Sequence, residues 1–99
     1  MKKTKFYIYM SAGGGLKKTE KVSGYADTID GLPIGLHKAG RAWTVTELST
    51  GLKITDGRTR AEALEKLQPM LDLVHRKITD DSFSPARDLI MAAYKAEAV

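Results

Sequence analysis

The segment best suited to holding a phosphate is Gly13-Gly14-Gly15, which is followed by Leu16, Lys17 and Lys18. Glycine lets a backbone approach a phosphate closely, and lysine supplies positive charge. A P-loop, however, needs a glycine directly before its lysine and a helix after it. Leu16 stands in that position, and the residues that follow are typical of a strand. The pattern therefore predicts a flexible hairpin, in which Lys17 and Lys18 are candidate contacts for an anionic partner.

The two histidines are the candidates for acid–base catalysis or metal binding. His37 lies in an expected strand and His75 in an expected helix, and the chain has no cysteine. Neither histidine has a second ligand at the spacing of a zinc or metalloprotease motif, so we expect no metal. His37 could act as a general base only if a nucleophile or carboxylate approached it in the folded chain. We therefore expect no catalytic residue and no cofactor, and predict a non-enzymatic protein.

The single tryptophan, Trp43, has basic residues around it. Arg41 precedes it by two positions, and His37 and Lys38 lie across an expected hairpin. Two interpretations fit such a ring. It either belongs to the core beneath a helix, or it forms a stacking platform for unpaired bases or a hot spot for a protein partner.

Arg58 and Arg60 flank Thr59 at an expected helix start, where cations are electrostatically unfavourable. Their position favours a functional role, since guanidinium groups beside a helix N-terminus can clamp a phosphate or a carboxylate. The alternative is that both are solvated surface residues. The complete set of predicted partner-binding residues is Lys17, Lys18, Lys21, Lys38, Arg41, Trp43, Arg58 and Arg60.

The elements that position these residues begin with a run of strands. Aliphatic and tyrosine side chains alternate from Phe6 to Met10, which is typical of a strand with one buried face. Gly24 interrupts a weaker strand, and Asp30-Gly31 indicates a turn after it. The expected strands cover residues 6–10, 21–29, 32–38, 42–46 and 52–54.

A long helix is expected to follow the strands. Thr59 and Glu62 form a capping box, and apolar residues recur every three or four positions from Leu64 to Ile78. Pro69 removes an amide donor within this stretch, so a kink is expected near residues 65–69. Because the apolar pattern continues across the proline, we expect one bent helix in preference to two separate helices.

A second helix is expected to begin with Ser84 as its N-cap and Pro85 at its first position. Asp80 and Asp81 precede it, where they favour a helix N-terminus rather than a catalytic dyad. The sequence therefore predicts an α+β fold, in which an antiparallel β-meander of four to five strands is packed on one face by two C-terminal helices. Its length of 99 residues indicates a single domain over residues 1–99.

Composition limits the class of protein further. The chain is 28% charged and 42% hydrophobic, which is typical of globular proteins, and its apolar runs are too short to span a bilayer. We expect no membrane partner, and the absence of cysteine favours the reducing cytoplasm. The net charge of +4 is uneven, since residues 1–60 carry +6 and residues 61–99 carry −2. An acidic protein surface, a nucleoprotein complex or a nucleic acid is expected to meet the strands and loops. The alternative is a solvated basic surface that keeps strand edges apart.

A strand and turn from Trp43 to Leu52 are followed by the helix start Gly57-x-Thr59-x-x-Glu62-Ala63-Leu64. In this pattern, residues 42–67 resemble HicB-like antitoxin domains. The resemblance implies a regulator of antitoxin type that binds nucleic acid. The whole chain is similar in style to short basic proteins of bacteriophages and other mobile elements, which commonly inhibit host defence or nuclease machinery by binding it.

The predicted function is therefore that of a binding and inhibitory protein, comparable to an anti-CRISPR protein, which blocks a host nucleoprotein or defence effector. An antitoxin-type nucleic-acid-binding regulator is the first alternative, and a small nucleotide-binding protein or hydrolase is the second. The oligomeric state is left open, because a basic edge strand can be free, covered or paired with a second copy.

Overall fold

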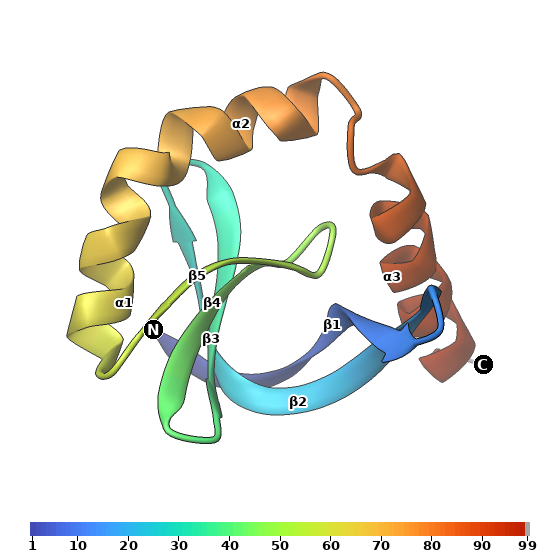
Figure 1. Cartoon of the computed structure of the whole chain (residues 1–99), viewed down its shortest axis with the longest axis horizontal. Helices are drawn as coiled ribbons and strands as arrows, with labels where there is room; N and C mark the ends of the chain where they lie inside the picture. Colours follow the sequence, from blue (N-terminus) through green and yellow to red (C-terminus); the bar gives the residue numbers. More distant parts are fainter. Residues whose placement is uncertain (99) are drawn as a thin grey trace.

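A computed structural model of the chain describes residues 1–98, and Val99 lies outside the described part. One antiparallel sheet has its strands in the order of the sequence (Figure 1). They are β1 (Lys2–Gly13), β2 (Leu16–Ile29), β3 (Leu32–Ala39), β4 (Ala42–Glu47) and β5 (Leu52–Gly57). The helical part comprises α1 (Arg60–Leu67), a 3-10 turn (Gln68–Met70), α2 (Leu71–Thr79) and α3 (Ser84–Glu97). The expected α+β fold is thereby confirmed.

The main core lies between the sheet and α1. Leu36 of β3 and Val45 of β4 are paired in register and fully buried, as are Ala63 and Leu67 of α1. By the strand register, Tyr7 shares this face of the sheet, and the Tyr94 ring of α3 packs edge-on against it. The helices therefore lie on one face of the sheet, as predicted.

The opposite face is buried because the β1–β2 ribbon curls over it. β2 pairs with β3 only from Tyr25 onward, and the part of β2 before Gly24 pairs with β1 alone. A side chain at Gly24 would place its Cβ 2.1 Å from the Leu36 carbonyl oxygen, and one at Gly35 would lie 2.8 Å from the Phe6 ring. Glycine at these two positions lets the ribbon bend across the sheet and lets Phe6 pack to 2% exposure.

The first two strands are longer than the sequence indicated. β1 continues to Gly13 and β2 begins at Leu16, so the predicted hairpin is present and its turn has only two residues. Gly14 and Gly15 have φ values of 58° and 80°, which suit a type I′ turn. The expected ends were wrong because both faces of the ribbon tip are exposed, so no alternation of apolar and polar residues marks the strands there.

The predicted kink in the first helix is present. One 3-10 turn at Pro69 separates α1 from α2, and Leu67, Gln68 and Leu71 keep right-handed helical backbone angles across it. The chain changes direction strongly at this point (Figure 1). The break overlaps the expected range and contains Pro69, which has no amide hydrogen to donate. The Glu65 carbonyl accepts a hydrogen bond from the Gln68 amide instead, which tightens this turn.

The start of the second helix corrects one prediction. Ser84 is the first helical residue of α3, and Phe83 occupies the N-cap position with no side-chain capping bond. The helix is instead preceded by a turn in which Asp80 accepts hydrogen bonds from the backbone and side chain of Ser82. No helix in residues 1–98 is long and apolar enough to cross a membrane.

Candidate functional site

The centre of the candidate site is the side chain of Arg60 lying over two aromatic rings. Its guanidinium carbon is 4.9 Å from the Tyr25 ring centroid and 5.4 Å from that of Trp43. The two ring centroids are 6.3 Å apart, with their planes inclined at 44°. Tyr25 comes from β2, Trp43 from β4 and Arg60 from the first turn of α1, so the cluster forms only when sheet and helix meet.

The contact with Arg60 shows that Trp43 is neither wholly in the core nor wholly on the surface. Its ring is half-buried, and it packs against the main core while its outer side lies beneath Arg60. Trp43 is therefore both a core aromatic and part of a surface site.

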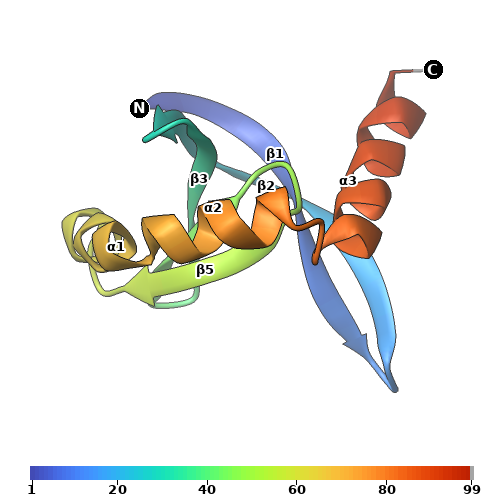
Figure 2. The same ribbon diagram turned by 90° about the horizontal axis from the view of Figure 1, so that it is seen from above.

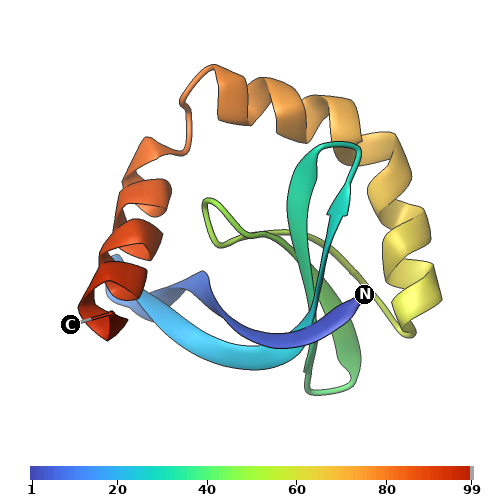
Figure 3. The ribbon, with the colours of Figure 1, turned by 180° about the vertical axis from the view of Figure 1, so that it is seen from behind.

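Three other predicted residues lie around this cluster. Lys38 is paired in register with Trp43, Arg41 lies in the turn that joins β3 to β4, and Arg58 precedes the capping residue of α1. All three are exposed. The β3–β4 turn and the start of α1 lie at the same end of the molecule (Figure 3).

The start of α1 is built as predicted. The Thr59 hydroxyl accepts a hydrogen bond of 3.1 Å from the Glu62 amide. The Glu62 carboxylate lies 3.3 Å from Lys66 and 3.7 Å from Arg58. The hydrogen bond from Lys66, followed by the contributions of Arg58, lowers the pKa of Glu62. This acid is thus engaged on one side of the helix, while Arg60 makes no ion pair within residues 1–98.

The remaining predicted lysines lie elsewhere. Lys17 and Lys18 stand at the tip of the β1–β2 ribbon, which projects away from α1 (Figure 2). Lys17 donates a 2.8 Å hydrogen bond to the Ser11 hydroxyl. Lys21 forms an ion pair with Glu97 of α3 and lies 5.8 Å from the Tyr7 ring centroid. The predicted set is therefore divided between the α1 cluster, the ribbon tip and the contact with α3.

His37 is buried on the curled face of the sheet, with 6% of its surface exposed. Its ring packs edge-on against Phe6 at 6.0 Å between centroids, and its Nδ1 has no hydrogen-bond partner. Burial lowers the pKa of His37, and the nearby charge of Glu20 partly opposes this shift. His75 is half-buried, and its Nε2 lies 2.7 Å from the Asp30 carbonyl oxygen, where it ties α2 to the β2–β3 turn.

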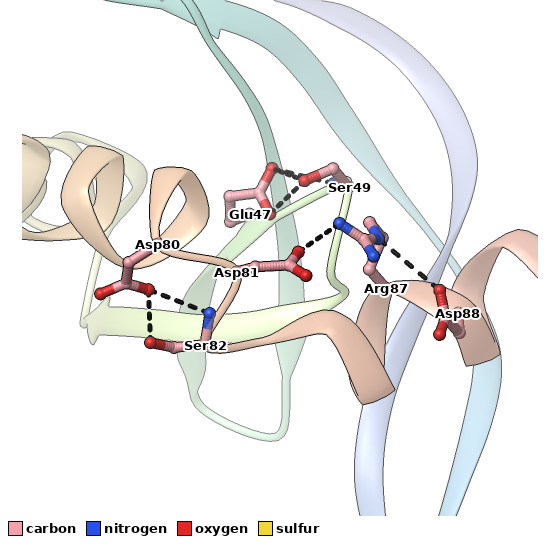
Figure 4. A network of polar contacts seen from close by, with 7 residues as sticks. All are labelled: Glu47, Ser49, Asp80, Asp81, Ser82, Arg87 and Asp88. Atoms are coloured by element: carbon pink, nitrogen blue, oxygen red, sulfur yellow. Dashed lines mark hydrogen bonds and ion pairs between the residues drawn. The ribbon is translucent and has the colours of Figure 1, made fainter.

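Residues 1–98 contain no group of three His, Cys, Asp or Glu side chains arranged to hold a metal ion. Asp80 and Asp81 lie in the connection between α2 and α3, where Asp80 accepts a hydrogen bond from Ser82 and Asp81 pairs with Arg87 (Figure 4). Neither aspartate faces the other as a catalytic dyad would, because each carboxylate is held by its own partner.

One structural residue gave no signal in the sequence. Glu47 is 2% exposed, and its carboxylate accepts hydrogen bonds from the backbone amides and hydroxyls of Ser49 and Thr50. Figure 4 shows it beside the α2–α3 connection. The acid stabilises the turn from within, because buried backbone donors need acceptors.

Comparison with known proteins gives no assignment. No protein-family model, curated protein or solved structure matches this chain. The likeness of residues 42–67 to HicB-like domains therefore stays an expectation, and the function is inferred from the geometry described above.

Proposed function

We propose that this protein is a non-enzymatic binding protein that captures an anionic surface of a protein or nucleoprotein and blocks it. The observation that carries the proposal is the Arg60 guanidinium, fixed over Tyr25 and Trp43 and without an acidic partner in residues 1–98. Lys38, Arg41 and Arg58 surround it with further positive charge.

Two physical features favour capture of a carboxylate or a phosphate at this cluster. A guanidinium already held by aromatic rings loses less side-chain entropy on binding than a free one, and its N–H groups match these anions in bidentate geometry. The N-terminal end of α1 also presents the positive end of the helix dipole. An anion bound there is therefore stabilised by the Arg60 guanidinium and by the dipole.

Blocking of a host nucleoprotein or defence effector is the form of this function that we favour, because the chain is similar in style to small inhibitory phage proteins. In this role the protein binds its target and performs no reaction on it.

The test is a quantitative pull-down from the native host with wild-type protein, the Arg60→Glu variant and a Lys95→Glu control on α3. We expect Arg60→Glu to lose the captured partner by about tenfold or more, because a hydrogen bond to a charged group is worth about 1.5–3 kcal/mol. The melting temperature should stay near that of wild type, since Arg60 is exposed. Equal capture by all three proteins would remove the cluster from consideration.

A separate Lys17→Glu, Lys18→Glu double variant measures the contribution of the ribbon tip. If the tip and the α1 cluster meet the same partner, both variants should weaken capture. Loss confined to Arg60→Glu would assign the contact to the α1 cluster.

The second candidate is a nucleic-acid-binding regulator of antitoxin type, which the combination of arginine and aromatic rings favours because such surfaces stack unpaired bases. It requires an affinity for free DNA or RNA that falls steeply as salt is added. Binding that is weak or insensitive to salt would exclude this candidate while leaving capture of an acidic protein in place.

A further inference from the structure

An apolar groove lies between the helix after the kink and the last strand of the sheet. Its volume is about 300 Å³. The residues that line it include Leu52 and Ile54 of β5, Met70 of the 3-10 turn, and Leu73, Val74 and Ile78 of α2. This volume is at the lower end of the range for ligand sites, and its apolar lining is typical of a surface that binds a partner.

The groove exists because α2 leaves the sheet after Pro69. α1 has two fully buried apolar residues against the sheet, whereas in α2 only Leu71 is buried. Leu73 is 46% exposed, and Val74 and Ile78 are half-buried. β5 is the outermost strand, so no further strand covers the apolar side chains on this side. Val74 and Ile78 pack partly against the main core, and their outer surfaces, together with Leu73, are left uncovered by residues 1–98.

The charge presented at the groove is positive. Lys53 and Lys77 line it together with Glu47, but the Glu47 carboxylate is buried and accepts hydrogen bonds from Ser49 and Thr50. The Lys53 ammonium lies 2.7 Å from the Asp56 carboxylate and forms an ion pair with it. Lys77 has no ion-pair partner in the described chain. A complementary occupant is apolar where it enters the groove and acidic at its borders.

The shape of the groove favours a helix over an added strand. The register of β5 against β4 shifts at Ile54, which has no residue opposite it, and such irregular edges are poor templates for strand pairing. The distance along the helix from Met70 to Ile78 is about 12 Å at 1.5 Å per residue. That length matches two turns of a second helix, which presents anchors at positions i, i+3 or i+4, and i+7.

We propose that this groove receives an acidic amphipathic helix of the protein partner, whose apolar side chains pack on Leu73, Val74 and Ile54 and whose carboxylates reach Lys77. The inference rests on the proposed function, in which the partner presents an acidic surface. It adds an apolar anchor to a contact that charge alone would make weak and dependent on salt.

The test uses a displayed library of helical peptides of about 16 residues. Leucine is fixed at positions i, i+4 and i+7, and the positions that flank this apolar stripe are varied among Glu, Lys, Gln and Ala. Selection is carried out on the wild-type protein, and the enriched peptides are measured by fluorescence anisotropy. We expect enrichment of glutamate over lysine, and chemical-shift changes at Leu73, Val74 and Ile54 in NMR spectra of the labelled protein.

Two variants with matched controls locate the contact. Leu73→Asp should weaken the enriched peptides roughly tenfold or more, whereas Leu89→Asp, at a leucine of α3 that is 40% exposed, should not. Lys77→Glu should reduce the preference for acidic peptides severalfold, and Lys95→Glu should leave it unchanged. Both groove residues lie near the surface, and a melting curve of each variant verifies that it folds.

Several outcomes would overturn the inference. They are the absence of any enriched peptide, enrichment of basic peptides, binding that Leu73→Asp leaves intact, and a self-association of the chain that Leu73→Asp abolishes. The last result would assign the groove to a second copy. The proposed function is tested independently, since a partner lost with Arg60→Glu but retained with Leu73→Asp would keep the cationic site and exclude the groove.

Discussion

At the scale of single residues, His37 is the group whose charge state the fold controls most directly. It is buried on the curled face of the sheet against Phe6, and its Nδ1 has no hydrogen-bond partner. A buried imidazole in apolar surroundings is stable only when neutral, because burial penalises the charged form. His37, the candidate general base, is therefore a histidine of the core.

This burial predicts that the protein becomes less stable in mild acid. The pKa of His37 in the folded state lies below the ordinary value of 6.5, so the unfolded chain binds the extra proton first. Above pH 6.5, protonation of His37 should add no pH dependence to the free energy of unfolding. The free energy of unfolding should then fall as the pH is lowered from 6.5 to the folded-state pKa. Thermal melts between about pH 7.5 and 5 measure the effect.

Two variants show whether the pH dependence of stability comes from His37 or from His75. His37→Phe keeps an aromatic ring beside Phe6 and should remove most of this dependence, whereas His75→Gln should retain it. An unchanged pH dependence in His37→Phe would contradict the interpretation.

At the scale of elements, the bend of β2 decides where the β1–β2 ribbon lies against the rest of the sheet. Up to Gly24 the strand pairs with β1 alone, and from Tyr25 onward it also pairs with β3. The ribbon then crosses the sheet, and the Tyr9 amide donates a 2.8 Å hydrogen bond to the Gly51 carbonyl in the β4–β5 turn. The bend brings distant strand segments together, so a small change at its centre should affect the whole ribbon.

Gly24→Ala should destabilise the protein by about 1–3 kcal/mol, the usual cost of forcing an extra carbon into a packed site. The physical reason is that the new Cβ would stand 2.1 Å from the Leu36 carbonyl oxygen, and a backbone atom cannot move aside as a flexible side chain can. Chemical denaturation measures the change. Ser23→Ala, at the neighbouring exposed position, should stay within about 0.5 kcal/mol of wild type. Equal stability of both variants would show that the strand does not bend at Gly24.

At the scale of the whole molecule, α3 covers the free edge of the sheet. The Tyr7 amide donates a 3.1 Å hydrogen bond to the Tyr94 hydroxyl, and Lys21 pairs with Glu97. Ile90 is 2% exposed and packs on the β4–β5 turn at Gly51. The basic edge strand is thus covered along part of its length, which protects it from pairing with other chains.

Ile90→Ala should therefore release α3 from the sheet. The expected cost is about 2–5 kcal/mol, as for other large-to-small changes in a core. Hydrogen exchange should show faster exchange of the Tyr7 amide and of the α3 amides, because the edge loses its cover. Leu89→Ala, one residue earlier and 40% exposed, should leave exchange at Tyr7 unchanged. Protection of Tyr7 that survives Ile90→Ala would show that α3 does not depend on this anchor.

The sequence by itself determined the local elements of this protein. Alternating residues from Phe6 to Met10, the capping pair Thr59 and Glu62, and Pro69 each act over a few positions, so the sheet, the helix start and the kink could be read directly. It also supplied the candidates Trp43 and Arg60, because residue types and local positions are visible without a fold.

Tertiary structure alone decided which of these residues meet. Arg60 joins Tyr25 and Trp43 because α1 packs across strands that are distant along the chain, and Lys17 and Lys18 separate from them because the ribbon curls away. The groove beside α2 follows from the same cause, since the direction of the helix after Pro69 is set by packing and not by local propensity. Periodicity and capping are short-range, whereas a binding surface is made by long-range contacts, and no pattern within one segment encodes them.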